Sequence, residues 1–358
     1  MNRTVLEVSF SEGKPYRYAC LEPLPGHPQL LAAVLEDHTI DLPSKVTTSL
    51  VIIDTKLKAL QTLVSGADFY AMPKFSPNGK RIAWWQWSHP DMPWEGGEIY
   101  VADVILSKDL QLSVERPVHV AGKKGAIGAG YPAWANNERL IFTSDESGFI
   151  NPYKFENSHA SPLLAAPIDE DFGQCYWMLH FFLYAILDEE GKTGVFSACR
   201  DGRSILYLVD LDGGSEPKLI ESSYVLINGV RSVSRKNHQS VMFAQKEDEE
   251  DSIVQLSLES SDKLELRVIK SALPLKIQGV PLSRGIISVP QPLTLRVGSN
   301  GDPLYVVHYA PHNPNYSGTS INGEKPPCIV NVHGGPTFFT PQGLNWTKQY
   351  FTSRGWAW

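Results

Sequence analysis

The sequence predicts a mainly β fold, in which an incomplete β-propeller precedes a shorter segment of strands and one helix. Three observations favour this fold class. Short apolar strands recur on either side of tight turns, several strands end in an acidic residue, and the pattern changes after residue 285. The 358 residues exceed the ~100–200 of a usual single domain. We therefore expect two domains, residues 1–285 and residues 286–358.

A turn motif marks the first domain. Residues 75–84 show it most clearly, as a strand, a tight Pro-Asn-Gly turn and a second strand. Weaker versions of the same frame occur in residues 20–34, 132–142 and 233–243. Because each version joins two apolar runs through turn-forming residues, each predicts a β-hairpin.

Strands that end in an acidic turn accompany these hairpins, in residues 50–54, 99–103 and 206–210. Four short strands that recur about every 40–50 residues are typical of a β-propeller blade. An ordinary β-sandwich also alternates strands and turns, but the joint recurrence of both motifs favours the propeller. We expect about five blades in this domain.

The second domain begins with two strands, residues 290–297 and 303–310, around Gly301-Asp302. An apolar run follows the proline pair Pro326-Pro327 and predicts a buried strand. Residues 347–354 predict a short helix closed by Gly355, and residues 356–358 would begin another strand.

His333, Gly334, Gly335 and Pro336 follow the apolar run directly. Glycines leave main-chain N–H groups accessible, which is what an oxyanion needs for stabilisation. In α/β-hydrolases a His-Gly-Gly-type loop after the third strand supplies one such N–H. The alternative is a plain strand-to-loop turn with a packed histidine. With the flanking prolines and strand, the pattern predicts the first strands and helix of an α/β-hydrolase domain.

Residues 326–358 resemble the start of the catalytic domain of the prolyl oligopeptidase family of serine peptidases, in its acylaminoacyl-peptidase and dipeptidyl-peptidase-like branch. Three upstream stretches resemble the same branch: Leu-Glu-Asp-His-Thr at 35–39, Gly-Ala-Asp-Phe-Tyr at 66–70 and His-Pro-Asp-Met-Pro-Trp at 89–94. The resemblance implies a chain truncated at both ends, with N-terminal blades missing and the catalytic domain cut before its nucleophile.

The resemblance also assigns roles in the oxyanion loop. It implies that Gly335 supplies the oxyanion N–H, that Gly334 lets the loop turn, that His333 shapes the loop and that Pro336 stiffens it. The implied parent enzyme cleaves short peptides or acylated peptides through an acyl-enzyme.

The catalytic triad is absent from the sequence. No Gly-x-Ser-x-Gly elbow occurs, and no Asp or His follows Gly335. By the chain order of α/β-hydrolases, the Ser, Asp and His should lie beyond Trp358. We therefore expect the isolated chain to be inactive. The alternative function is a non-catalytic β-propeller that acts as a binding or scaffold module.

Charge and composition argue against nucleic-acid and membrane partners. A net charge of −7 and a pI near 5.8 argue against nucleic-acid binding. The longest apolar run, residues 175–187, is shorter than the ~20 residues of a membrane span, and the N-terminus lacks a signal-peptide layout. The four cysteines form no Cys-x-x-Cys pair, which favours reduced thiols and a cytoplasmic protein.

Other motifs predict no cofactor or metal. The histidines lack metal-ligand spacing, and the Gly-rich residues 122–130 lack the Gly-Lys-Ser/Thr of a phosphate loop. The loop at 89–95 is interpreted as a packed aromatic loop rather than a substrate channel. The acidic run 246–251 is interpreted as a solvated hairpin tip rather than a grip for a peptide amino terminus. The oligomeric state stays open.

Overall fold

The computed structural model describes residues 15–173, 176–178, 182–260, 263–277, 280–319, 321–335 and 338–358. The chain forms two compact units. The first comprises Met1–His180, Asp188–Gly194 and Val209–Pro217, and the second comprises Phe181–Leu187, Val195–Leu208 and Lys218–Trp358. This division falls among the repeated sheets, whereas the predicted domain boundary follows the change of sequence pattern at residue 285.

The described residues form five four-stranded sheets, and each consists of four strands consecutive in the chain. The first two are β1 (Tyr16–Leu24), β2 (His27–Asp37), β3 (Thr47–Asp54) and β4 (Ala59–Val64), then β5 (Phe69–Phe75), β6 (Arg81–Trp87), β7 (Glu98–Leu106) and β8 (Leu112–Ala121). The short helix α1 (Pro93–Gly96) lies between β6 and β7 in the chain.

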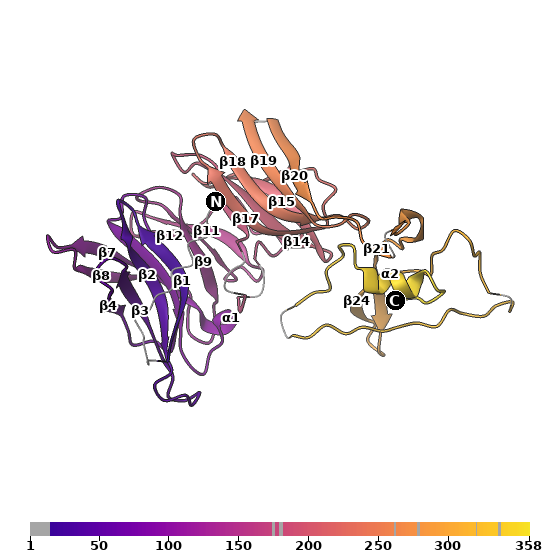
Figure 1. Ribbon diagram of the computed structural model, residues 1–358, viewed down its shortest axis with the longest axis horizontal. Helices are drawn as coiled ribbons and strands as arrows, with labels where there is room; N and C mark the ends of the chain where they lie inside the picture. Colours follow the sequence, from indigo (N-terminus) through magenta and orange to yellow (C-terminus); the bar gives the residue numbers. More distant parts are fainter. Residues whose placement is uncertain are drawn as a thin grey trace. The chain divides into compact units, whose positions relative to one another are not determined.

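The other three sheets repeat this order. They are β9 (Ala129–Trp134), β10 (Leu140–Ser144), β11 (Asn151–Glu156) and β12 (His159–Pro162); β13 (Tyr184–Ile186), β14 (Thr193–Arg200), β15 (Arg203–Asp210) and β16 (Lys218–Ile220); and β17 (Leu226–Ser234), β18 (Gln239–Gln245), β19 (Ser252–Ser260) and β20 (Lys263–Ser271). Figure 1 shows β18, β19 and β20 side by side in chain order. Sheets of this kind make the blades of a propeller.

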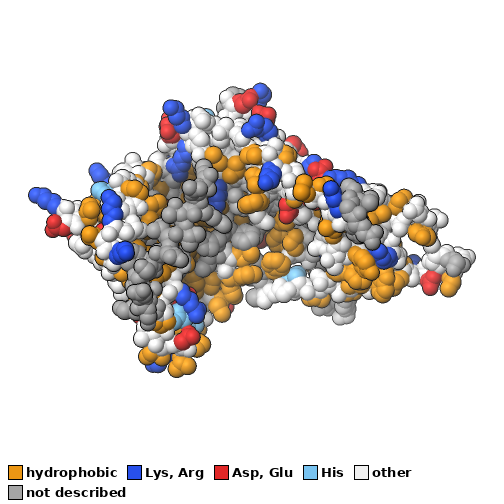
Figure 2. Space-filling model, viewed as in Figure 1, with side chains coloured by type: hydrophobic (Ala, Val, Ile, Leu, Met, Phe, Trp, Pro, Cys, Tyr) orange, Lys and Arg blue, Asp and Glu red, His pale blue; other side chains and the backbone are white. Residues whose placement is uncertain are grey.

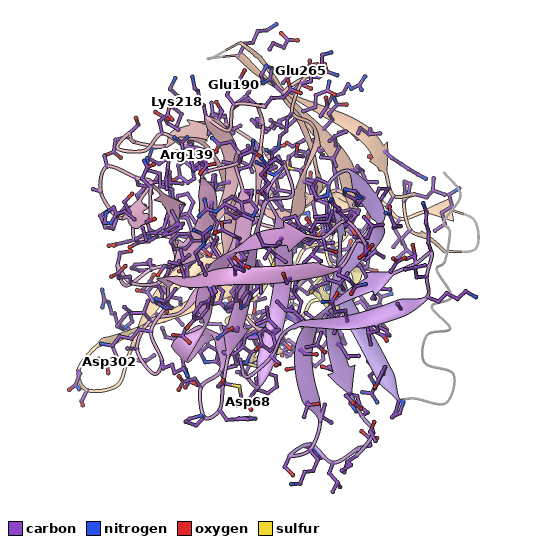
Figure 3. The ribbon with its side chains drawn as sticks, turned by 90° about the vertical axis from the view of Figure 1, so that its left-hand side faces the viewer. Asp68, Arg139, Glu190, Lys218, Glu265 and Asp302 are labelled. Carbon is purple, nitrogen blue, oxygen red and sulfur yellow. The ribbon has the colours of Figure 1, made fainter. Side chains whose placement is uncertain are left out.

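The C-terminal elements are smaller. They are β21 (Lys276–Ile277), β22 (Val280–Pro281), the 3₁₀ turn η2 (Arg284–Ile286), β23 (Gln291–Val297), β24 (Asp302–His308) and α2 (Trp346–Thr352). The β23–β24 hairpin is antiparallel and pairs Val297 with Asp302 at its tip, where Figure 3 labels Asp302.

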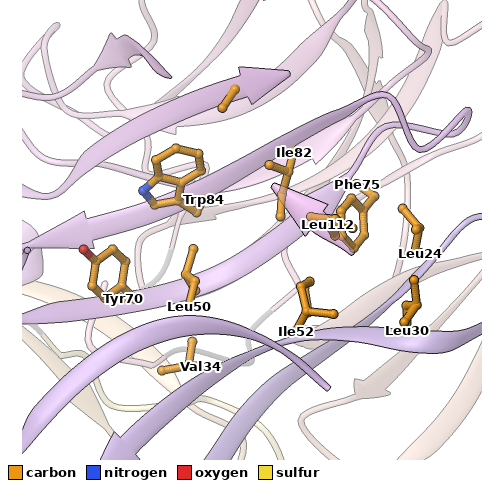
Figure 4. Close-up of a cluster of buried hydrophobic side chains, with 12 residues drawn as sticks. Leu24, Leu30, Val34, Leu50, Ile52, Tyr70, Phe75, Ile82, Trp84 and Leu112 are labelled. Carbon is orange, nitrogen blue, oxygen red and sulfur yellow. The ribbon is translucent and has the colours of Figure 1, made fainter. Parts of the chain in front are cut away.

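A large apolar cluster lies between the first two sheets. Leu50 and Ile52 of β3 and Ile82 and Trp84 of β6 are nearly or fully buried in it (Figure 4). Both strands are buried on both faces over their apolar runs, and Leu50, Ile52, Ile82 and Trp84 take alternate positions, so they lie on one face of each strand. These inward faces fill the space between the two sheets, so each sheet is part of its neighbour's core.

The predicted turns connect neighbouring sheets within the first unit. The Asn137 side chain between β9 and β10 accepts a 2.9 Å hydrogen bond from the backbone N–H of Asn78, in the turn between β5 and β6. The Asn136 side chain donates at 3.0 Å to the backbone carbonyl of Glu190. The turn motif found in the sequence therefore joins one sheet to the next as well as reversing the chain.

Arg139 reinforces the second of these connections. Its guanidinium is buried, donates to the Gly191 carbonyl at 3.1 Å, and pairs with Glu156 at 3.2 Å and Asp212 at 2.8 Å. Figure 3 labels Arg139 and Glu190, which both come from turns of the first unit. Here a buried cation is compensated by two carboxylates and a carbonyl.

The acidic residues that end strands serve their own turns. Asp54 Oδ1 accepts hydrogen bonds from the backbone N–H groups of Lys56 and Leu57, at 2.8 and 2.9 Å. Asp210 Oδ1 accepts one from Asp212 at 2.9 Å. An aspartate that binds the backbone a few residues ahead closes a turn without help from the rest of the fold. The third predicted ending is wrong, because Asp103 lies inside β7 and pairs with Arg116 of β8 at 2.5 Å.

A feature that the sequence did not predict is a bulge in the first strand of four sheets. The pairing register shifts within β1, β5, β9 and β17, where each strand pairs with the second strand of its sheet. Each shift contains a residue with positive φ. These residues are Cys20 (φ 54°), Met72 (φ 49°), Tyr131 (φ 56°) and Gly229 (φ 63°). Only one is a glycine, so residue type gave no sign of the bulge.

The C-terminal strands form a mixed arrangement next to β24. Tyr309 and Trp358 exchange two backbone hydrogen bonds, at 2.8 and 3.0 Å, so residues 356–358 continue the sheet beside β24. Ala357 forms a parallel bridge with Cys328 and donates to the Pro327 carbonyl at 2.8 Å. The order is therefore β23, β24, residues 356–358, residues 327–329. Figure 1 shows the C-terminus beside β24.

The apolar run after the proline pair was predicted to be a buried strand, but it is exposed. Val330 and Val332 are 81% and 84% exposed, and Cys328 forms only a single bridge, to Ala357. A parallel strand is normally buried because elements cover both faces of its sheet. No described element covers this run, so its apolar side chains reach the surface, where Figure 2 shows apolar side chains on the C-terminal part (right).

The helix α2 ends earlier than predicted. Its C-cap is Ser353, and Gly355 (φ 89°) turns the chain two residues later. The last turn tightens because the Arg354 N–H donates to the Phe351 carbonyl, three residues back, at 3.0 Å. Asn345 caps the other end by accepting from the Lys348 N–H at 3.1 Å.

Candidate functional site

The His-Gly-Gly loop lies at the end of the short run that pairs with Ala357. Gly334 and Gly335 are exposed and lie outside every paired strand of the described residues. A Cβ built on Gly334 would meet no atom within 4 Å. Their amides are thus not used in a sheet ladder, which is the state that an oxyanion loop requires.

His333 is held locally. Its Nδ1 atom lies 2.7 Å from the Gly334 carbonyl oxygen, and its ring meets the edge of Phe338 with 6.1 Å between centroids. The side chain is exposed rather than packed in a core, so the alternative of a packed core histidine does not describe it. Pro336, the fourth residue of the predicted loop, lies outside the described residues.

A cavity of about 380 Å³ opens beside this loop, within the second unit. Val332, His333, Gly334 and Phe338 line one part of it. The segment before and within α2 lines another part through Thr340, Pro341, Gly343, Leu344, Asn345 and Lys348. This volume falls within the ~300–1,000 Å³ of small-ligand sites.

The wall of the cavity is fixed by contacts with β18. The Gln245 side chain, which also lines the cavity, donates to the Leu344 carbonyl at 2.9 Å. A Cβ on Gly343 would lie 1.8 Å from Gln245 Oε1, so a larger residue there would displace the Gln245 side chain. Gln342 is fully buried, donates to the Asp201 carbonyl at 2.7 Å and accepts from Arg203 at 2.8 Å. The segment that precedes α2 is therefore attached to the sheets of its own unit.

The helix α2 is anchored through its buried face. The Gln349 amide accepts from the Ser288 N–H at 2.7 Å and donates to the Ser288 carbonyl at 3.0 Å. These paired bonds fix the helix against residues 287–288. They also set the direction of Lys348, the preceding residue, which lines the cavity.

Lys348 is the unexpected residue of this site. It is only 6% exposed, and its Nζ donates to the Tyr309 hydroxyl at 3.1 Å and to the Pro341 carbonyl at 3.3 Å. The ammonium also lies 4.5 Å from the centroid of the Tyr309 ring. Burial lowers the pKa of Lys348, and burial raises the pKa of Tyr309 to about 12.

Sequence reasoning missed Lys348, because lysine is almost always exposed and no motif surrounds it. One signal was available in the helix itself. Lys348 and Thr352 are four residues apart and therefore share a face, and both are buried. Such a lysine stands out only once the buried face of the helix is known.

The acidic run after β18 forms a hairpin tip, as predicted, but it is not simply solvated. Arg203 pairs with Glu247 at 3.0 Å, and Arg284 pairs with Glu250 at 3.5 Å. Glu250 is 15% exposed. Since these carboxylates already have cationic partners, the run is bound within its own unit and offers little to a substrate amine.

The loop at 89–95 is held by its own acidic residues. Asp91 accepts from the Gly125 N–H at 2.7 Å, and Glu95 accepts from the Met92 N–H at 2.8 Å. Both contacts stabilise the loop and α1, in line with its interpretation as a packed loop. Among the described residues, no group of three or more His, Cys, Asp or Glu side chains could hold a metal ion.

Comparison with known proteins finds similar solved structures. No family model matches the sequence, and no curated protein matches it. A puromycin-hydrolysing peptidase of Mycobacterium tuberculosis, however, shares 26% identity with a TM-score of 0.78, over 96% of this chain and 49% of that chain. Puromycin hydrolase matches with 22% identity and a TM-score of 0.80, over 96% and 49%. Prolyl oligopeptidase B of Galerina marginata matches with 9% identity and a TM-score of 0.63, over 96% and 45%.

The chain shares the fold of the matched parts of puromycin hydrolases and prolyl oligopeptidases. It spans about half the length of these structures. The resemblance that the motifs suggested is therefore confirmed at the level of the fold, and the mainly β fold is confirmed as well, since the repeated sheets match the propeller part of prolyl oligopeptidases. Within the described ranges, no helix is both long and apolar enough to cross a membrane.

Proposed function

We propose that this chain forms the propeller part and the first part of the α/β-hydrolase domain of a serine peptidase that acts on short or acylated peptides in the cytoplasm. One observation carries the proposal. The His-Gly-Gly loop is exposed at the end of its strand and lies beside a cavity of ligand size. The similar structures include proteins named as peptidases.

The order of the C-terminal strands supports the hydrolase assignment. β23 and β24 form an antiparallel hairpin, and residues 356–358 pair beside it through Tyr309. Residues 356–358 also pair in parallel with residues 327–329. The connection between these two parallel runs contains α2. Parallel strands joined through a helix are the basic unit of an α/β sheet. The His-Gly-Gly loop thus sits where a βαβ unit begins.

In this proposal Gly335 supplies a backbone N–H to the oxyanion of the tetrahedral intermediate. Gly334 has no positive φ, so the turn predicted for it does not require a glycine. In the proposal His333 shapes the loop through its contact with the Gly334 carbonyl, and Pro336 stiffens it. The serine oxygen of the complete enzyme bonds to the scissile carbonyl carbon, and a histidine accepts the serine proton. That histidine then protonates the leaving amine, and water hydrolyses the acyl-enzyme.

The sequence contains no Gly-x-Ser-x-Gly elbow, and in this proposal the triad comes from residues beyond Trp358. A fluorophosphonate probe, which labels activated serines, tests this directly. We expect no labelling of the 358-residue chain. Labelling at any serine would show an activated nucleophile within it and overturn the assignment.

A second experiment tests the oxyanion role in the protein encoded by the whole reading frame around this sequence. Gly335→Pro removes the N–H and should lower kcat for a short peptide p-nitroanilide by about 10²–10³ with little change in KM. Gly334→Ala keeps the N–H and meets no neighbour, so its effect should be small. A reading frame with no downstream nucleophile in a stably expressed protein would instead support the non-catalytic binding module.

A further inference from the structure

The cavity beside the His-Gly-Gly loop contains a charge that the proposed function does not use. This charge is the ammonium of Lys348, which is buried in the cavity wall. Within the described part of the chain, no carboxylate lies within ion-pair distance of its Nζ. Both of its hydrogen-bond partners, the Tyr309 hydroxyl and the Pro341 carbonyl, are neutral.

A buried ammonium without a counter-ion is unfavourable. Removing such an ion from water costs several kcal/mol even after relaxation, and buried lysines are normally paired. The Tyr309 ring offsets part of this cost through a cation–π contact. An ammonium has three N–H donors, and the two neutral acceptors use two of them. One donor and one uncompensated charge remain at the cavity wall.

The rest of the lining also favours an anion. No Asp or Glu is among the described residues that line the cavity. The side-chain amides of Gln245, Asn331 and Asn345 and the imidazole of His333 are the other polar side-chain groups that can donate hydrogen bonds, apart from Thr340. Val332, Phe338 and Leu344 add apolar surface. The cavity therefore combines one buried positive charge, neutral donors and an apolar wall.

We propose that this cavity binds a carboxylate, held by Lys348, on a small ligand with an apolar body, such as an N-acyl amino acid or the C-terminal end of a short peptide. A carboxylate carries one negative charge and so balances one ammonium. A phosphate monoester carries about −1.5 to −2 at pH 7 and would leave negative charge uncompensated in the cavity. An ammonium–carboxylate contact is a charge-assisted hydrogen bond, which is roughly twice as strong as a neutral one.

The inference deepens the proposed function, because it names a group that a peptide ligand would present at the same site. It rests on that function only for the peptide character of the ligand. The charge balance at Lys348 belongs to the described chain and needs no nucleophile. Binding can therefore be measured on the 358-residue chain, independently of the fluorophosphonate test.

The experiment compares N-acetylphenylalanine with N-acetylphenylalaninamide by isothermal titration calorimetry on the 358-residue chain. We expect the acid to bind at least about tenfold more tightly than the amide, a difference of about 1.4 kcal/mol. Lys348→Met keeps an unbranched apolar side chain in the buried position and should remove this preference. Lys325→Met makes the same change at an exposed lysine and should preserve it.

Phe338→Ala is the second variant, and it keeps the test decisive if Lys348→Met does not fold. Because Phe338 lines the apolar wall, its loss should weaken the acid and the amide by the same factor and leave their ratio intact. Equal binding of acid and amide to the unmodified chain would overturn the proposal. A preference for the acid that persists in Lys348→Met would also overturn it. So would a preference that Phe338→Ala abolishes while the amide still binds normally.

A chain that binds the acid selectively but belongs to a reading frame without a nucleophile would support the carboxylate site and not the peptidase. A labelled, active full-length enzyme whose 358-residue part shows no acid preference would support the peptidase and overturn the carboxylate site. The two proposals can thus fail separately.

Discussion

The strands β3 and β23 were predicted by the same kind of apolar pattern, but they end in different surroundings. The last five residues of β3 are all buried, whereas every residue of β23 is exposed. On β23, Leu293, Leu295 and Val297 alternate along one face and are 43%, 44% and 40% exposed. Every residue of β3 pairs with β2 and every residue of β23 pairs with β24, although β3 also pairs with β4 on its other edge. Strand formation therefore needs only a partner strand, and burial needs a second layer.

The largest expected difference between the two regions lies in matched leucines. Leu50→Ala in β3 creates a cavity in the core of Figure 4 and should destabilise the protein by about 2–5 kcal/mol. Leu295→Ala in β23 removes a half-exposed side chain and should change stability by no more than about 0.5 kcal/mol. Urea unfolding followed by circular dichroism measures both. Equal losses would show that β23 is covered in solution.

A second pair compares arginines. Arg139→Met leaves Glu156 and Asp212 without their common partner and removes a hydrogen bond to Gly191, so we expect a loss of about 1–3 kcal/mol. Arg296→Met in β23 removes only one exposed hydrogen bond to the Gly301 carbonyl and should cost less than about 0.5 kcal/mol. The same urea titration reports both. An Arg139 variant as stable as the Arg296 variant would mean that the turns do not connect the sheets energetically.

A smaller effect depends on pH and is confined to the first sheet. Hydrogen bonds to Asp41 and Glu36 raise the pKa of His38, and the bond to His38 lowers the pKa of Asp41. The His38 contribution is full below its unfolded pKa of about 6.5 and is lost as pH rises through the raised folded pKa. The Asp41 contribution is full above its unfolded pKa of about 3.9 and is lost as pH falls through the lowered one.

The contact should therefore stabilise the protein most between these two limits. Thermal melting from pH 5 to pH 9 should show Tm falling at the alkaline end more in the unmodified chain than in His38→Gln, which lacks the titrating group. Parallel profiles for the two proteins would contradict this assignment.

The smallest stability effect is expected at the surface of residues 327–332. Val330→Lys replaces an 81% exposed apolar side chain and should leave the urea midpoint nearly unchanged. It should nevertheless reduce concentration-dependent association, because a charge blocks pairing at an open apolar strand. Light scattering at increasing protein concentration measures this. Unchanged association would show that the exposed run is not where copies meet.

Local chemistry explains how far the sequence could predict the fold. The Pro-Asn-Gly turn and its variants, and aspartates such as Asp54, act within a few residues of themselves, so hairpins and strand ends could be located from the sequence. The bulges could not, because Cys20, Met72 and Tyr131 adopt positive φ under the constraint of neighbouring strands. The exposure of Val330 and Val332 was missed for a related reason. Apolar side chains indicate that a strand favours burial, but whether it is buried depends on other elements that pack over it.

The candidate site divides in the same way. His333, Gly334 and Gly335 were found from their order in the chain, and the structure places His333 and Gly334 in the lining of a cavity. Lys348 and Gln245 reach that cavity from a helix and a distant strand, and contacts over about a hundred residues leave no local pattern. Whether Gly335 binds an oxyanion stays a prediction for the experiment described above.

The side-chain amides of Asn136 and Asn137 bind the backbones of turns that belong to different sheets. A repeat of this protein is therefore not a self-contained cassette. Duplicating, deleting or transplanting one sheet would leave backbone groups on its neighbours without partners, unless the adjoining turn moved with it. Recombination in such a chain should succeed most often when its breakpoints fall inside a sheet and keep each pair of adjoining turns together.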